Sequence, residues 1–211
     1  MRIILGFIIS ALQFQLVFGE IDTQSLVRAD SLFLHGPANQ KTLIFKQDGK
    51  RVSYFAATAM TLSAPIDSVQ NAILNYGDYV YRHKYVERAE KVDGSTRFIV
   101  LRVMHIRAWF LGEIVSGQIE KNIRTISFQQ SDREDWREWC RSQMAERGRL
   151  DFSVFQMQYK LMETDKGTRV SLTAQAIPES TIPDWLFRRV TKRVFPRFLK
   201  EIGKKVATGH L

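Results

Sequence analysis

Residues 149–211, RLDFSVFQMQYKLMETDKGTRVSLTAQAIPESTIPDWLFRRVTKRVFPRFLKEIGKKVATGHL, decide the fold of this chain. Two segments of alternating apolar and polar residues, 151–162 and 168–176, flank the turn Asp165-Lys166-Gly167, a pattern typical of a β-hairpin. After Ile177-Pro178, apolar residues recur every three to four positions, which predicts a long amphipathic helix beginning near Thr181. Such a helix can lie across one face of a curved sheet.

The two predicted strands have one apolar and one polar face. On the first strand, Phe155, Met157 and Tyr159 share a face, and Gln156 and Gln158 lie on the other. The return strand repeats the pattern with the apolar set Val170, Leu172, Ala174 and Ala176. This alternation predicts a sheet that is covered by apolar packing on a single side.

Short turns join further β-forming segments upstream. Six segments read as strands: 41–45, 51–62, 85–91, 97–106, 110–119 and 123–130. Strands joined by short turns are antiparallel neighbours. Between the second and third of these, 65–74 has the apolar spacing of a helix face, and a second helical turn is expected at 77–81. Residues 20–40 form an N-terminal lead-in with a short helix at 25–34.

An insertion, residues 131–149, breaks the rhythm of the strands. Ser131 followed by Glu134 is a capping-box pattern, and Trp136, Trp139 and Cys140 then share one face of a helix. We expect a short charged helix. A solvated excursion is the alternative, because the segment is rich in charge and longer than an ordinary hairpin loop.

The order of these elements resembles the START and polyketide cyclase-like (SRPBCC) superfamily, which has the helix-grip fold. The matching pieces are Ser63-Ala64-Pro65-Ile66 before the first helix, the hairpin at 165–170, and Ile177-Pro178 before the last helix. The resemblance covers about 51–207 and implies an α+β domain over 41–211. It implies a curved antiparallel sheet of about seven strands wrapped around a long C-terminal helix, with two short helices after the first core strand.

The resemblance also implies a hydrophobic cavity between the sheet and the last helix. It would place the insertion at the mouth of that cavity, near the loop 177–181. Relatives have a short connection at the position of the insertion, so the entrance of this protein is expected to be restricted or gated.

The first residues predict export. Arg2, an apolar run over 3–18 and Gly19 have the layout of a secretory signal peptide spanning 1–19. An uncleaved membrane anchor is the alternative, but the run is short for a spanning helix and contains two glutamines. We therefore expect a periplasmic or secreted protein. Cys140 is the single cysteine, so no internal disulfide is expected.

Positive charge is concentrated in the last helix. The chain has a formal net charge of +9. Export argues against nucleic acid as the partner, and an anionic membrane surface is the more consistent one. The residues expected to face that surface are Arg188, Arg189, Lys192, Arg193 and Arg197. The alternative is that these side chains form the solvated face of a helix packed on the sheet.

The sequence contains no catalytic or metal-binding pattern. Its four histidines lie far apart, and it has neither a phosphate-binding glycine loop nor a nucleophile elbow, so we expect no metal and no cofactor. A small-molecule cyclase or hydrolase is an alternative function. Its candidate residues are Arg102, His105, Glu113 and Tyr159, but strand alternation puts Arg102 and His105 on opposite faces.

The sequence thus predicts a monomeric carrier of a hydrophobic or amphiphilic, lipid-like ligand. A module that binds the membrane surface through the last helix is a further alternative, which can combine with the carrier. The residues expected to line the cavity are Trp109, Leu111, Phe155, Met157, Tyr159, Leu172, Ala174, Trp185, Val190 and Val194. Trp136 and Trp139 are expected at its mouth.

Overall fold

The computed structural model describes residues 23–37, 41–48, 51–75, 85–103, 105–120, 122–131, 133–144 and 148–208. The predicted signal peptide and the helical turn expected at 77–81 lie outside these residues. The strands described are β1 (Lys41–Gln47), β2 (Ser53–Leu62), β3 (Val86–Asp93), β4 (Thr96–Val103), β5 (Ile106–Glu120), β6 (Ile123–Gln130), β7 (Arg149–Leu150), β8 (Phe152–Thr164) and β9 (Gly167–Pro178). The helices described are α2 (Thr23–His35), α3 (Ile66–Leu74), α5 (Glu134–Ser142) and α6 (Asp184–Ala207).

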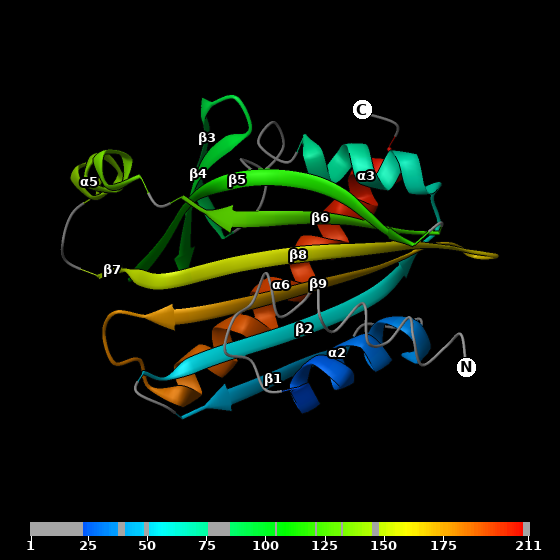
Figure 1. Cartoon of the computed structure of the whole chain (residues 1–211), viewed down its shortest axis with the longest axis horizontal. Helices are drawn as coiled ribbons and strands as arrows, with labels where there is room; N and C mark the ends of the chain where they lie inside the picture. The colour runs from blue at the N-terminus through cyan, green and yellow to red at the C-terminus, as the bar shows by residue number, and fades with distance from the viewer. Residues whose placement is uncertain are drawn as a thin grey trace.

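All of these strands belong to one sheet. Its order is β1-β2-β9-β8-β6-β5-β4-β3, every neighbouring pair along this path is antiparallel, and β7 adds two residues in parallel beside β5. The predicted antiparallel α+β fold with a long C-terminal helix is confirmed, with nine strands in place of about seven. The sheet has α2 in front of it and α6 behind it (Figure 1).

The β8–β9 hairpin forms where the sequence predicted it. Its turn lies at Asp165-Lys166, and Gly167 follows with a φ of +116°, which side chains rarely tolerate. A Cβ atom at Gly167 would lie 2.2 Å from the carbonyl oxygen of Leu62, so only glycine fits here. The hairpin tip can therefore lie directly against the end of β2.

The inner face of the sheet carries the main core. Leu161, Leu172 and Val170 from the hairpin pack there with Phe198 and Ile202 from the C-terminal half of α6. Helix α3 closes the same end of the core through Val69 and its neighbours. This end of the molecule is filled by side chains, so any hollow must lie toward the N-terminal half of α6.

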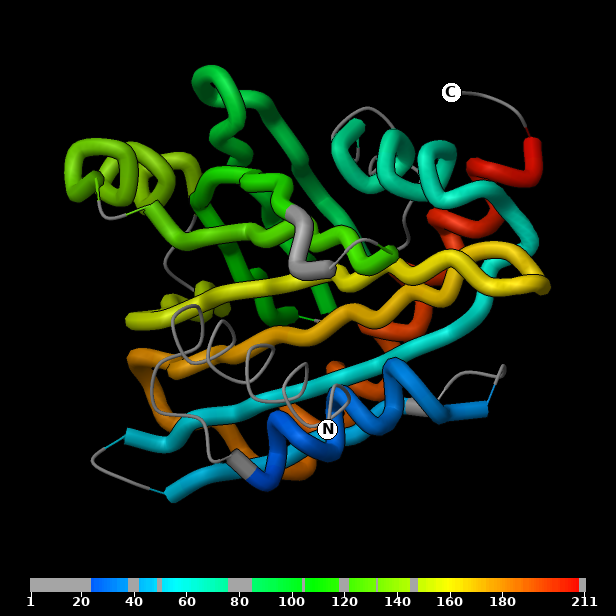
Figure 2. Tube along the Cα trace, turned by 45° about the vertical axis from the view of Figure 1, so that its right-hand side comes forward, coloured from blue at the N-terminus to red at the C-terminus, as the bar shows by residue number. Residues whose placement is uncertain are grey.

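Helix α2 covers part of the outer face, and the helix expected at 25–34 is thereby confirmed. Leu26 and its apolar neighbours pack on Phe55 and Ala57 of β2. Arg169 of β9 donates hydrogen bonds to the carbonyl oxygens of Leu32, Phe33 and Pro37, at 2.8, 3.0 and 2.8 Å. Arg169 thereby caps the C-terminal end of the helix, where the Leu32 carbonyl also accepts a hydrogen bond from the backbone N–H of Gly36 at 3.1 Å. Figure 2 shows α2 lying along β1 and β2.

The insertion forms α5, and α5 packs on the outer face as well. Its Cys140 is fully buried against Phe98, Trp109 and Leu111 of β4 and β5, with Trp136 beside them. The capping box predicted for α5 is wrong, because the helix begins at Glu134 after Arg133 without a side-chain cap. Helix α6 begins at Asp184 after Pro183, three residues later than predicted, also without a side-chain cap.

Candidate ligand cavity

A cavity lies between the N-terminal half of α6 and the inner face of the sheet. Helix α6 and the loop before it supply Ile182, Leu186, Phe187, Val190, Thr191, Val194 and Phe195. The sheet supplies Ala56, Leu101, Val103, Ile106, Ala108, Phe110, Leu150, Phe152, Phe155, Ala174 and Ala176. Six strands and one helix thus meet around a single apolar space.

Small residues on the sheet leave this space open. Ala56 of β2 and Ala174 of β9 are register partners, and Ala176 lies two residues further along β9, so the floor beneath α6 has side chains of one carbon. At the opposite wall, Phe110 and Phe155 stack with their ring centroids 3.6 Å apart. The alanines create the hollow, and the aromatic rings bound it.

The hollow is modest in the form described. Its volume is about 90 Å³. Because one water occupies ~30 Å³ in the liquid, the cavity has room for roughly three waters. A molecule of lipid size needs more room than this, which means that the N-terminal half of α6 or the preceding loop must move outward to admit one.

The chemistry of the lining is almost wholly apolar. Among the described residues that surround the cavity, Thr191 carries the single polar side chain and none carries a charge. Thr191 is only 3% exposed. Such a wall binds by removing apolar ligand surface from water, and it would penalise a charged group that entered without a partner.

Four of the predicted lining residues are brought together at the cavity. Phe155 and Ala174 reach it from the sheet, and Val190 and Val194 reach it from α6. Met157, Tyr159 and Leu172 share the same face but lie further along the strands, where they pack into the main core rather than line the hollow.

Three other predicted lining residues lie elsewhere. Trp109 and Leu111 point to the outer face of β5, because their neighbours Ala108 and Phe110 occupy the inner face and strand side chains alternate. Both faces of β5 are buried, the outer one by α5, so hydrophobicity alone does not tell them apart. Trp185 is 63% exposed on the outward side of α6.

The predicted mouth residues also lie on the outer face of the sheet. Trp136 packs with Trp109 and Leu111, and Trp139 meets Phe98 edge-on with ring centroids 5.6 Å apart. The family resemblance predicted that the insertion lies at the cavity mouth. Instead, the buried face of α5 packs on the apolar outer face of β4 and β5. It is therefore a second covering of the sheet.

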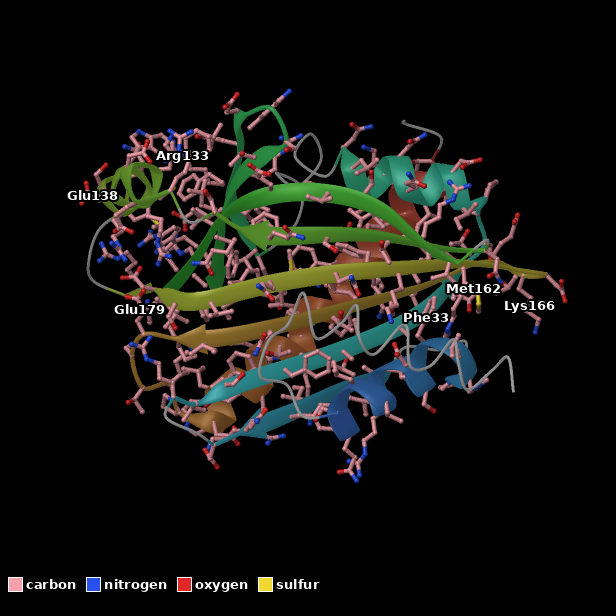
Figure 3. All side chains as sticks on the ribbon, viewed as in Figure 1. Phe33, Arg133, Glu138, Met162, Lys166 and Glu179 are labelled. Atoms are coloured by element: carbon pink, nitrogen blue, oxygen red, sulfur yellow. The ribbon has the colours of Figure 1, made fainter. Side chains whose placement is uncertain are left out.

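Helix α5 still reaches the loop that bounds the cavity. Glu179 of the β9–α6 loop accepts a hydrogen bond at 3.4 Å from Arg137, and its carboxylate lies 3.8 Å from Arg141. Glu179 lies at the same end of the molecule as Glu138 of α5 and Arg133, the residue before that helix (Figure 3). A few residues on, Ile182 lines the cavity, so α5 braces one of its walls.

Tyr54 holds the other side of this loop. Its hydroxyl donates to the carbonyl oxygen of Ile182 at 3.4 Å, and its ring stacks on Phe187 at a centroid distance of 3.9 Å. Both Ile182 and Phe187 line the cavity. The loop and the first turn of α6 are thus fixed from β2 and from α5, and opening the cavity must break some of these contacts.

The residues predicted to face a membrane all lie on α6, and they differ in whether they form ion pairs. Arg188 pairs with Asp184 at 2.7 Å and Arg197 with Glu201 at 3.8 Å. Arg189, Lys192 and Arg193 are exposed and make no ion pair with any residue the structure describes. These three cations and Trp185 lie along the outward side of the helix that roofs the cavity.

The candidate catalytic residues do not converge. Arg102 pairs with Glu87 at 3.7 Å near the surface, and His105 and Glu113 are exposed. Tyr159 is buried in the core, where desolvation raises the pKa of its phenol far above the ordinary value. In the described part of the chain, no group of three His, Cys, Asp or Glu side chains could hold a metal.

Several lining residues escaped prediction, among them Ala56, Phe110, Phe152, Phe187 and Thr191. Phe187 was recognisable as part of the apolar stripe of α6. The alanines carried no signal of their own, since an alanine in a strand is compatible with either face. Only the register of β2 against β9 reveals that two of them lie side by side.

Comparisons with known proteins bear on the fold. No protein-family model matches the chain, and no curated protein matches it. The structure of human STARD10 aligns with a TM-score of 0.57 at 10% identity, covering 90% of this chain and 82% of that one. A STAR-related lipid transfer protein from Xanthomonas axonopodis aligns with a TM-score of 0.56 at 14% identity, covering 79% and 98%.

The Zhui aromatase/cyclase of a Streptomyces species aligns with a TM-score of 0.51 at 9% identity, covering 80% of this chain and 94% of that one. Carriers and an enzyme therefore share this architecture. The chain has the START/SRPBCC-like fold that the order of its elements predicted, and its activity has to be argued from the cavity itself.

Proposed function

We propose that this protein binds and carries a hydrophobic or amphiphilic, lipid-like molecule in the cavity beneath α6. The observation that carries the proposal is the lining, which is apolar in every described residue except Thr191. Removing apolar ligand surface from water contributes about 25 cal/mol per Å². Burial of 200 Å² would thus contribute roughly 5 kcal/mol before the costs of binding.

The first test asks whether the protein holds an apolar molecule at all. Native mass spectrometry of protein purified gently from its own host should show co-purified apolar species. The uncharged fluorophore N-phenyl-1-naphthylamine should bind with an increase in fluorescence, and apolar molecules should displace it. Empty protein that also fails to bind the fluorophore would overturn the proposal.

Two variants locate the bound molecule in the cavity. Ala174→Leu fills the floor and Val190→Phe fills the roof, so each should weaken fluorophore binding at least about tenfold without unfolding the protein. Ala207→Phe adds apolar bulk at the exposed end of α6 and should bind as the wild type does. Unchanged binding by both filled variants would place the fluorophore elsewhere and remove the support for a carrier.

Loading and release are proposed to occur at an anionic membrane surface. The exposed cations Arg189, Lys192 and Arg193, which form no ion pair with a described residue, support this, as does the exposure of Trp185 beside the cavity-lining Leu186. A basic helix face attracts anionic headgroups, and tryptophan favours the interface. In the described residues, no helix is both long enough and apolar enough to cross a membrane.

We also propose that the protein is exported to the periplasm or secreted and works there as a monomer. The support for export is the charged and then apolar layout of residues 1–19. Intact-mass measurement of the protein from its own host should give a chain that begins at Glu20, and a chain that retains residues 1–19 would refute cleavage. Sedimentation should give a monomer mass.

A further inference from the structure

Thr191 offers the single hydrogen-bonding side chain among the described residues of the cavity wall. It lies in the N-terminal half of α6, it is 3% exposed, and its hydroxyl makes no hydrogen bond with a described residue. A buried hydroxyl is normally satisfied, because leaving it without a partner loses the hydrogen bonds it makes in water. This hydroxyl can therefore form a hydrogen bond with a molecule that occupies the cavity.

Charge is missing from the same wall. Glu179 of the loop and Asp184 of α6 do not line the cavity, and each forms an ion pair, Glu179 with Arg137 and Asp184 with Arg188. A carboxylate, phosphate or ammonium group inside would lose its hydration without gaining a counter-charge. The interior thus discriminates against ionised ligands.

We infer that the ligand is electrically neutral where it is buried, with one hydroxyl or carbonyl group that hydrogen-bonds to the Thr191 hydroxyl. The class is that of neutral lipids with a single hydroxyl or carbonyl group, such as long-chain alcohols. Fatty acids and phospholipids are disfavoured. This inference rests on the proposed carrier function and narrows it to a ligand class, with Thr191 as the residue that determines specificity.

The test uses ten-carbon probes that differ only in the head group. Decan-1-ol, decane, decanoate and decylammonium compete at pH 7.5 for the site occupied by N-phenyl-1-naphthylamine. Decan-1-ol should displace the fluorophore at a concentration about tenfold or more below that needed for either charged probe. It should also compete about three- to tenfold better than decane, after correction for aqueous solubility.

Substitutions at Thr191 separate its hydroxyl from its shape. Thr191→Val keeps the volume and removes the hydroxyl, so the advantage of decanol over decane should disappear while decane binds as before. Thr191→Ser keeps the hydroxyl and should retain the preference. The melting temperature of ligand-free Thr191→Val should stay equal or rise, because an unpartnered polar group has been removed.

The outcomes distinguish the neutral-ligand inference, the role of Thr191 and the proposed carrier function. Equal or tighter binding of decanoate or decylammonium overturns the neutral-ligand inference, and an unchanged alcohol preference in Thr191→Val overturns the role of Thr191. Both results would leave the carrier function standing, since the fluorophore is still bound and displaced. Failure of the fluorophore and of all four probes to bind would instead refute the proposed function itself.

Discussion

Burial raises the pKa of two side chains of the folded protein, Cys140 and Tyr159. Cys140 is fully buried under α5, where desolvation raises the pKa of its thiol from 9.0 to about 12. Tyr159 is buried in the main core, and desolvation raises the pKa of its phenol well above 10.0. An unfolded chain would release both protons near the ordinary values. Above about pH 9 the folded state therefore binds more protons than the unfolded state does.

Stability should consequently fall at alkaline pH. The free energy of unfolding decreases with pH wherever the folded state binds more protons, so the decline begins near pH 9 and steepens above pH 10. Tyr159→Phe removes one of the two protons, and its stability should fall less steeply above pH 10, by up to about 1.4 kcal/mol per pH unit. Urea unfolding at pH 8 to 11 measures both slopes, and identical slopes would contradict this account.

Individual residues were predictable where one face of a strand is polar. On β8 and β9 the alternation of Gln and Thr with apolar residues placed Phe155 and Ala174 on the inner face, and both line the cavity. On β5 the alternation fails, because Trp109 and Phe110 are both buried, under different coverings. The sequence of β5 alone does not show which of these residues faces α5 and which faces the cavity.

At the scale of elements, α2 is attached to the sheet by buried polar contacts. Asp30 of α2 and Lys160 of β8 form a buried ion pair at 2.6 Å, next to the cap that Arg169 provides. Breaking such a pair by removing one partner costs roughly 3–5 kcal/mol, since the remaining charge stays buried. The helix was predictable from its residues, but its attachment was not, because the partner residues lie more than 120 positions away.

The contact between α5 and the β9–α6 loop should control access to the cavity. Glu179→Gln removes the charge that Arg137 and Arg141 hold, each pair being worth up to about 1 kcal/mol at the surface. Loop opening should become easier, so the fluorophore should associate about two- to fivefold faster in stopped-flow measurements, and moderate salt should speed up the wild type in the same direction.

Glu138→Gln is the matched control for this contact. Glu138 is an exposed glutamate of the same helix and makes no ion pair with a described residue. It should leave the association rate unchanged. Equal rates for wild type and Glu179→Gln would show that the loop is not restrained by α5, and that the insertion serves only to cover the outer face.

At the scale of the whole molecule, the sheet separates two environments. Its inner face meets the core and the cavity, and its outer face meets α2 and α5. The order of elements predicted the inner arrangement, because a hairpin followed by a long helix has few ways to pack. The outer coverings come from two segments with other predicted roles: the residues read as an N-terminal lead-in, and the insertion that the family resemblance placed at the cavity mouth. Only long-range packing could reveal them as coverings.

The cations on the outward side of α6 allow a test of whether membrane binding depends on this helix or on the net charge of the whole protein. Replacing Arg189, Lys192 and Arg193 by Glu should reduce sedimentation with vesicles of 30% anionic phospholipid by on the order of a hundredfold, at about 1 kcal/mol per cation near the surface. The same change at exposed cations elsewhere, Arg28, Lys91 and Lys166, alters net charge equally and should have a much smaller effect. Wild-type binding should weaken as salt rises, because surface attraction is screened. Equal losses in both triple variants would mean that net charge alone attracts the protein, and that α6 has no privileged orientation toward the membrane.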